Sequence, residues 1–125
     1  MNNKKLGNEF EVEMCDILAQ IGYWVHFVVP DSRGAQPFDI IAVKDNKAYA
    51  IDCKTCVKDV ISIDRLEENQ ILAFDMWMRR GNGVPIVAVK HEGSIYLVPY
   101  TDLKVFGKVA LTDDLLFHKE GGLDD

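Results

Sequence analysis

The chain has 125 residues, of which 48% are apolar, so it suits one domain with a real hydrophobic core and leaves little room for two. No apolar run is as long as a membrane-spanning helix, and no apolar stretch follows the first residues, so we expect a cytosolic protein without a signal peptide. The net charge of −6 argues at first against a nucleic-acid partner. Residues 112–125 hold five acids and one lysine, however, so most of this charge belongs to the C-terminal tail and DNA binding is not excluded.

The first part of the chain predicts a helix, a strand and a loop. Residues 4–22 carry apolar side chains at helical spacing, so we expect an amphipathic helix that ends at Gly22. The segment 23–29 is rich in β-branched and aromatic residues and is predicted to be a strand. Residues 30–37 contain proline, aspartate, serine and glycine, and this composition predicts a loop.

A β-hairpin is predicted next. Residues 38–44 and 48–54 have strand composition, and the short polar segment 45–47 between them predicts a turn that makes the two strands antiparallel. The first strand is almost entirely apolar apart from Asp39, which is typical of a central strand that is covered on both faces.

The second half of the chain predicts alternating helices and strands. They are a short extended piece at 61–63, a helix over 65–80 capped by Asp64, strands over 84–90 and 94–98, and a short helix over 101–106 capped by Thr101. The main order is α-β-β-β-α-β-β, which predicts the α/β class, with one mixed central sheet flanked by helices. We expect a single domain over residues 1–111, followed by a loosely ordered acidic tail.

The three cysteines do not indicate a disulfide framework, because their number is odd and the expected compartment is reducing. Cys53 and Cys56 have C-x-x-C spacing, which raises a redox pair or half of a zinc site as alternatives. A structural zinc site needs about four ligands, and the sequence has no second such pair. We therefore favour Cys53 as a small apolar strand residue and Cys56 as part of the loop after it.

Three residues of the predicted hairpin carry the chemistry. Asp39 interrupts an apolar strand, where a lone carboxylate is costly unless a cation or a hydrogen bond satisfies it. Asp52 and Lys54 are two residues apart on the next strand, so their side chains point to one face. Two carboxylates that the hairpin brings together favour Mg²⁺ or Mn²⁺, and a nearby lysine can stabilise phosphate charge or help to activate a water. The alternative is a solvated strand face, since D-x-K is a common pattern.

The same residues resemble a known family. The segments DIIAV at residues 39–43 and AIDCK at residues 50–54 resemble the D-x(n)-(D/E)-x-K core of PD-(D/E)xK nucleases, which have a restriction-endonuclease-like fold. The segment GNEFE at residues 7–11 resembles the helix motif of archaeal-type Holliday junction resolvases and their phage relatives. Gln70, followed by Phe74, resembles the Gln-x-x-x-Phe of their second helix. The literal Pro-Asp pair is absent, because Phe38 precedes Asp39.

The resemblance implies an Mg²⁺- or Mn²⁺-dependent DNA endonuclease of recombination and repair, acting on branched DNA as a homodimer. It assigns Lys54, Asp52, Asp39, Glu9 and Gln70 to catalysis. It assigns Glu9, Asp39, Asp52 and the backbone carbonyl of Cys53 to the metal. It also makes Ser32 and Arg33 candidates for phosphate contact, and a phage-encoded protein acting in the host cytoplasm is plausible by association.

Two features leave alternatives open. The resolvases are usually basic and this chain is acidic, so another DNA endonuclease on the same fold, or a catalytically silent module that binds DNA or protein, remains possible for its function. A local basic rim is one interpretation of the positive residues, and scattered solvated charges are the other: Lys4, Lys5, Arg33, Lys54, Lys58 and Arg65. The apolar residues Phe74, Met76, Trp77 and Met78 of the second helix predict core or dimer packing rather than base stacking.

Overall fold

The fold follows the predicted order of elements, with short additions. The computed structural model describes residues 3–30 and 36–124, and for residues 3–7 it describes the backbone alone. The elements are α1 (Asn3–Gln20), β1 (Trp24–Phe27), β2 (Ile40–Lys44), β3 (Lys47–Thr55), β4 (Val60–Ser62), the 3₁₀ helix η1 (Ile63–Arg65), α2 (Glu68–Arg79), β5 (Ile86–His91), β6 (Ser94–Pro99), α3 (Tyr100–Phe106), β7 (Lys108–Ala110) and the 3₁₀ helix η2 (Asp113–Leu115).

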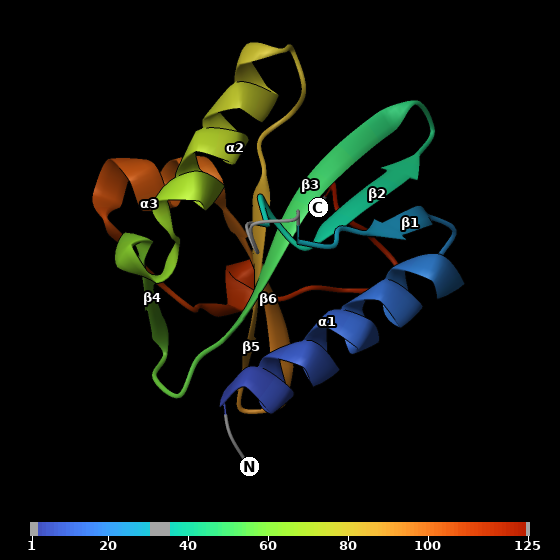
Figure 1. Cartoon of the computed structure of the whole chain (residues 1–125). Coiled ribbons are helices and arrows are strands. Elements are labelled where there is room, and N and C mark those ends of the chain that lie inside the picture. The colour runs from blue at the N-terminus through green and yellow to red at the C-terminus, as the bar shows by residue number, and fades with distance from the viewer. Residues whose placement is uncertain (1–2, 31–35, 125) are drawn as a thin grey trace.

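Five strands form a mixed central sheet in the order β1-β2-β3-β5-β6 (Figure 1). The strands β1, β2 and β3 are mutually antiparallel, β3 and β5 are parallel, and β5 and β6 are antiparallel. Parallel pairing of β3 with β5 requires a crossover, which the segment containing β4 and α2 provides. The predicted mixed α/β fold is confirmed, and β4 and β7 add a separate two-stranded sheet.

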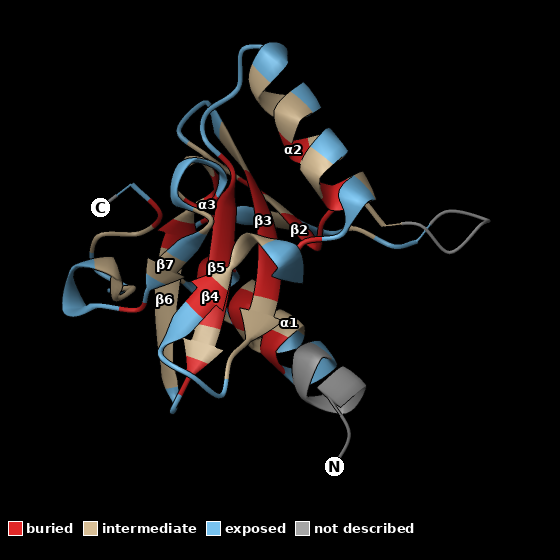
Figure 2. Ribbon diagram, turned by 90° about the vertical axis from the view of Figure 1, so that its left-hand side faces the viewer, coloured by how far each residue is buried: buried red, intermediate tan, exposed pale blue. Residues whose placement is uncertain are grey.

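Helices cover both faces of this sheet (Figures 1 and 2). On one face, α1 buries Phe10, Met14 and Leu18 against the central strands. On the other face, α2 and α3 bury Phe74 and Leu103. The sheet is therefore apolar on both sides at its centre, which explains why β2 and β5 are nearly continuous apolar runs in the sequence.

The turn between β2 and β3 sets the register of the predicted hairpin. Asp45 and Asn46 have φ angles of 53° and 66°, a left-handed conformation that Asn and Asp adopt more readily than most residues. Lys44 pairs with Lys47 across this turn, and the register continues to Ile40 opposite Ile51. The strand β3 extends beyond that point to Thr55, so its last residues have no β2 neighbour.

The starts of α2 and α3 differ from the predictions. The helix α2 begins at Glu68, not at Arg65, because Leu66 is extended and separates η1 from the helix. Its cap is Glu67, which forms a capping box with Gln70, and not Asp64. The helix α3 begins at Tyr100, one residue before the predicted cap at Thr101.

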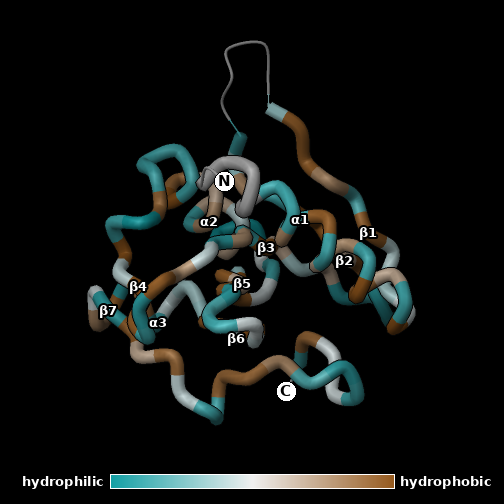
Figure 3. Tube along the Cα trace, turned by 90° about the horizontal axis from the view of Figure 1, so that it is seen from below, coloured by the Kyte–Doolittle hydropathy of each residue, from teal (hydrophilic) through white to brown (hydrophobic). Residues whose placement is uncertain are grey.

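The C-terminal segment is packed rather than loosely ordered, contrary to the prediction. Leu116 forms an isolated bridge with Tyr96 of β6, and the segment runs past this strand (Figure 3). Leu123 is buried in the core cluster on the α1 face, and its backbone N–H donates to the hydroxyl of Tyr23 at 2.9 Å. Apolar residues among the acids anchor this segment, which the charge pattern concealed. Across the described ranges 3–30 and 36–124, no helix is long and apolar enough to cross a membrane.

Candidate active site

Asp52 and Lys54 lie on the α2 face of β3, as strand alternation predicted. Ile51 and Cys53 point to the opposite face, into the core cluster that contains α1. The Asp52 side chain is fully buried, and its Oδ2 lies 2.9 Å from the Nζ of Lys54. The lysine side chain is 18% exposed, so the ion pair joins a buried carboxylate to the edge of solvent.

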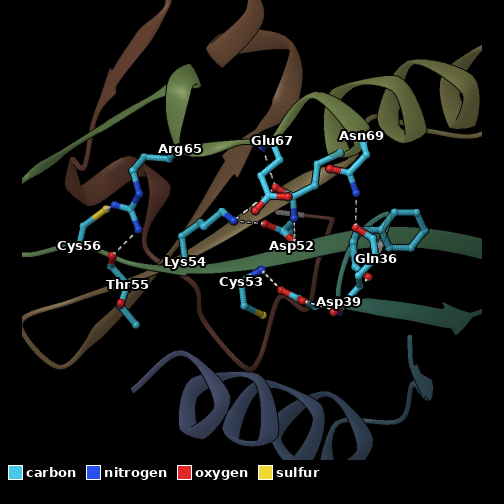
Figure 4. A network of polar contacts seen from close by, with 12 residues as sticks. Gln36, Asp39, Asp52, Cys53, Lys54, Thr55, Cys56, Arg65, Glu67 and Asn69 are labelled. Carbon is cyan, nitrogen blue, oxygen red and sulfur yellow. Dashed lines mark hydrogen bonds and ion pairs between the residues drawn. The ribbon is translucent and has the colours of Figure 1, made fainter. Parts of the chain in front are cut away.

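Gln70 joins this pair to the first turn of α2. Its side-chain amide donates from Nε2 to Oδ1 of Asp52 at 2.9 Å. Its Oε1 accepts the backbone N–H of Glu67 at 3.0 Å and the Nζ of Lys54 at 3.4 Å (Figure 4). The same side chain therefore caps α2 and orients both Asp52 and Lys54.

Asp39 immediately precedes the start of β2, at the point where β3 continues without a β2 neighbour. Its Oδ2 accepts the backbone N–H of Cys53 at 2.7 Å, and its Oδ1 accepts Nε2 of Gln36 at 2.7 Å. Asn69 of α2 donates to the backbone carbonyl of Gln36 at 2.9 Å. The carboxylate takes the place that a neighbouring strand would hold, because the pairing of β2 with β3 stops at Ile40.

The backbone carbonyl of Cys53 shares this edge. Within a strand, the N–H and C=O of one residue point to the same side. Since the Cys53 N–H points to Asp39, its carbonyl points away from β5 and toward the same space. This geometry is compatible with the carbonyl as a metal ligand. The Cys53 thiol is buried and free, and Cys56 follows β3, as we favoured from the sequence.

The helix α1 brings Glu11, and not the predicted Glu9, to the carboxylates. The partly buried side chain of Glu11 lies near enough to Asp39, Asp52 and Lys54 for these groups to affect its pKa. Glu9 is exposed, and it lies about 200° around the helix from Glu11. The sequence motif therefore located the helix, and on this helix Glu11, rather than Glu9, lies on the side near the carboxylates.

A signal for Glu11 was present in the sequence. The buried stripe of α1 consists of Phe10, Met14 and Leu18. Glu11 lies roughly 60° from the centre of this stripe, whereas Glu9 lies roughly 140° from it. An acid next to the buried stripe of a helix lies at the edge of the helix–sheet interface. From there Glu11 can approach Asp39, which directly precedes β2.

Burial and mutual repulsion raise the pKa values of the three carboxyls. Burial raises the pKa of Asp39 to about 6, against the opposing hydrogen bond from Cys53. Burial, together with the charge of Asp39, raises the pKa of Asp52 to about 7. Burial also raises the pKa of Glu11, although its interactions with Asp39 and Lys54 oppose this change. Converging carboxyls that resist ionisation favour a cation between them.

A divalent cation fits these residues. Oδ2 of Asp52 is buried and accepts no hydrogen bond of good geometry from the described residues. Within residues 3–30 and 36–124, no three acidic, histidine or cysteine side chains are already grouped as a complete ligand set. A pair of carboxylates with a backbone carbonyl suits Mg²⁺, which keeps several waters and uses one or two protein carboxylates.

The raised pKa values predict how the stability of the metal-free protein changes with pH. Asp39 and Asp52 have folded-state pKa values above the ordinary value of 3.8, so their stabilising contribution is complete below that value and is lost as the pH rises through about 6 to 7. In EDTA, thermal unfolding should show a loss of about 1–3 kcal/mol from this site between pH 5 and pH 8.

The variant Asp52→Asn isolates this contribution from other titrations. We expect its stability to fall less than that of the wild type over the same pH range, and we expect Mg²⁺ at pH 8 to stabilise the wild type more than the variant. Parallel pH profiles of the two proteins in EDTA would contradict the assignment of the raised pKa to Asp52.

The two candidates for phosphate contact, Ser32 and Arg33, lie outside the described residues. Their positions relative to the carboxylates therefore stay a prediction from the family resemblance. Gln36 is the first described residue after this stretch, and its bond to Asp39 places the end of the loop beside the site.

The fold and the site together define a nuclease of the PD-(D/E)xK superfamily: Asp39 and the Asp52-x-Lys54 pair meet on a hairpin of a mixed sheet. The family model described as archaeal Holliday junction resolvase (hjc) matches residues 2–116, and the chain belongs to this family. The chain is accordingly a DNA endonuclease of the Holliday junction resolvase type, and its family implies dependence on a divalent metal.

Two relatives agree with this assignment. The chain is 26% identical over 91 residues to the crossover junction endodeoxyribonuclease Hje of Saccharolobus islandicus. This match covers 72% of this chain and 67% of the relative. The solved structure of Hjc from Archaeoglobus fulgidus, a Holliday junction resolvase, is 21% identical and has a TM-score of 0.61. The match covers 76% of this chain and 78% of that one, and it supports the fold.

Proposed function

We propose that this chain resolves four-way DNA junctions with Mg²⁺ or Mn²⁺ held by Asp39, Asp52 and the carbonyl of Cys53, and that Glu11 completes the site in place of Glu9. The observation that carries the proposal is geometric: Asp39 accepts the backbone N–H of Cys53, beside the buried Asp52 and its ion pair with Lys54. Glu11 of α1 is near enough to both carboxylates to interact with them. Because β2 begins only at Ile40, opposite Ile51, residues 52–55 of β3 have no β2 neighbour, and Asp39 lies at this edge.

Each of the remaining polar residues has a role in this scheme. Lys54 is 2.9 Å from Asp52 and reaches solvent, so it can orient the attacking water or stabilise the negative charge that develops on the phosphate. Gln70 fixes the positions of Asp52 and Lys54 through its two hydrogen bonds. A bound divalent cation would polarise the phosphate and lower the pKa of the attacking water.

A homodimer is part of the proposal, because resolution needs cuts in two strands. The outer side of α2 supports it: Leu72 and Met76 are exposed and lie four residues apart on one face. Phe74 is buried in the core beneath them. An isologous contact through this apolar face would cover it and place two sites in one particle. Action in the cytoplasm, as by a phage-encoded protein in its host, stays a prediction.

Cleavage of synthetic substrates tests the function directly. The protein is incubated with a labelled four-way junction and with a linear duplex built from one of its arms, in Mg²⁺, in Mn²⁺ and in EDTA. We expect paired, symmetric nicks in the junction with either metal, an uncut duplex, and no cutting in EDTA. Paired nicks within one binding event would also support the homodimer.

Other outcomes select the alternatives. Equal cutting of junction and duplex would indicate a general DNA endonuclease on the same fold. Binding of DNA without cleavage in Mg²⁺ or Mn²⁺ would indicate a catalytically silent module and would contradict the proposed chemistry.

A further inference from the structure

Four positive side chains from different parts of the chain gather beside the active site. A groove of about 750 Å³ is lined by Lys54 of β3, Lys58 of the loop after it, Arg65 of η1 and Lys108 of β7. Asp64 is the one acidic residue among its described lining residues. In a chain of net charge −6, this groove is a local concentration of positive charge.

The pairing of β4 with β7 builds the groove. Ser62 pairs with Lys108 in this two-stranded sheet, and the N–H of Ile63 donates to the carbonyl of Gly107 at 2.8 Å. These contacts bring Lys108 to the same wall as Arg65, although more than 40 residues separate them in the sequence. The small sheet therefore adds a cation that no sequence motif connects with the active site.

Arg65 is held by the end of β3. Its Nη2 donates to the carbonyl of Thr55 at 3.0 Å, and its Nη1 lies 3.4 Å from Sγ of Cys56 (Figure 4). A guanidinium has five N–H donors, so these contacts fix its plane and leave donors that face solvent. This arrangement suits recognition of a phosphate oxygen.

Two lysines of the groove, Lys58 and Lys108, have no acidic partner among the described residues, unlike several other lysines. Lys47, Lys90 and Lys104 each form an ion pair with an acid elsewhere in the fold. Across residues 3–30 and 36–124, Lys58 and Lys108 are exposed and pair with no described acid. Exposed, unpaired cations in a row are available to an anionic partner.

We propose that this groove binds the sugar-phosphate backbone of the DNA strand that continues from the cleaved phosphodiester, with Lys58, Arg65 and Lys108 as the phosphate-contacting residues. The inference rests on the proposed function, since Lys54 belongs both to the groove and to the active site. A DNA strand that presents its scissile phosphate to Lys54 would carry its next phosphates along this wall. Contacts of this kind position the strand without reading its sequence.

Binding measurements in EDTA test the groove independently of cleavage. The variants Lys58→Gln, Arg65→Gln and Lys108→Gln are compared with the wild type by fluorescence anisotropy, using the four-way junction and the linear duplex over a series of salt concentrations. Lys119→Gln is the matched control, because Lys119 is exposed and lies outside the groove while the charge change is the same.

Each groove variant should weaken binding to both DNAs by roughly 3- to 10-fold and reduce the slope of log K against log salt by about 1. The control should keep the wild-type affinity and slope. Because Arg65 also contacts β3, the decisive variants are Lys58→Gln and Lys108→Gln, and Arg65→Lys shows whether charge alone suffices there.

Unchanged affinity and slope in both lysine variants would overturn the inference. An equal loss of affinity in Lys119→Gln would also overturn it, because it would show that binding depends only on the total charge of the protein. These results are distinguishable from a failure of the proposed function. If the groove variants lose binding but the wild type cuts no DNA in Mg²⁺ or Mn²⁺, the groove stands and the nuclease assignment fails.

Discussion

Asp52→Asn should reduce cleavage of the four-way junction by at least about 10³-fold, because the substitution removes a metal-binding charge at the centre of the site. The change preserves the volume of a fully buried side chain, and the asparagine oxygen can still accept the bond from Gln70. The fold and the affinity for DNA in EDTA should therefore remain. Single-turnover cleavage in saturating Mg²⁺, together with circular dichroism, measures these two expectations.

The matched control for this variant is Asp113→Asn, because Asp113 is exposed in the C-terminal segment. We expect it to cleave at the wild-type rate. If Asp52→Asn cleaves normally while remaining folded, the metal site is not where Asp39, Asp52 and Lys54 converge.

Glu11→Gln should reduce cleavage strongly, whereas Glu9→Gln should leave it almost unchanged. Glu11 lies near Asp39 and Asp52, so its loss should lower the rate at saturating DNA by about 10²-fold or more and raise the Mg²⁺ concentration needed for half-maximal activity. Glu9 is an exposed residue of the same helix, and its substitution should change the rate by less than about threefold. The two variants carry the same charge change, so each is the control for the other.

The metal dependence separates a ligand role from a structural one. A Glu11→Gln protein that has lost activity but responds to Mg²⁺ at the wild-type concentration would assign Glu11 to packing rather than to the metal. Loss of activity in Glu9→Gln with an active Glu11→Gln would restore Glu9 as the glutamate of the site.

Hydrogen bonding around the site explains why α2 matters to it. The first turn of this helix contacts both carboxylates: Gln70 binds Asp52 directly, and Asn69 holds the backbone of Gln36, whose side chain binds Asp39. The capping box that begins α2 uses the same Gln70 side chain. The start of the helix and the spacing of the carboxylates are therefore set by one network, which is visible in Figure 4.

The sequence by itself determined the parts of the site that depend on local geometry. Strand alternation placed Asp52 and Lys54 on one face, and the Asp45-Asn46 turn fixed the hairpin that brings Asp39 beside them. A lone carboxylate in an apolar strand also indicated a functional residue, because burying a carboxylate without a partner is costly. These features need only the period of a strand and the length of a turn.

Only the tertiary structure decided the features that depend on how elements pack. The predicted helix formed as Asn3–Gln20, two residues shorter at its C-terminal end, and its rotation against the sheet brought Glu11, rather than Glu9, near the carboxylates. The helix α2 starts at Glu68 because Leu66 is extended, and Gln70 both closes the capping box with Glu67 and binds Asp52. The acidic C-terminal segment packs against the domain because Leu123 is buried in the core cluster on the α1 face.

The positive groove beside the active site shows the same division between local and long-range features. The sequence could name Lys54, Lys58 and Arg65 as a possible rim, since they lie close together along the chain. Lys108 joins them only through the pairing of β4 with β7, which is a long-range contact. Periodicity reports which face of an element a residue occupies, but the packing of elements determines which faces meet.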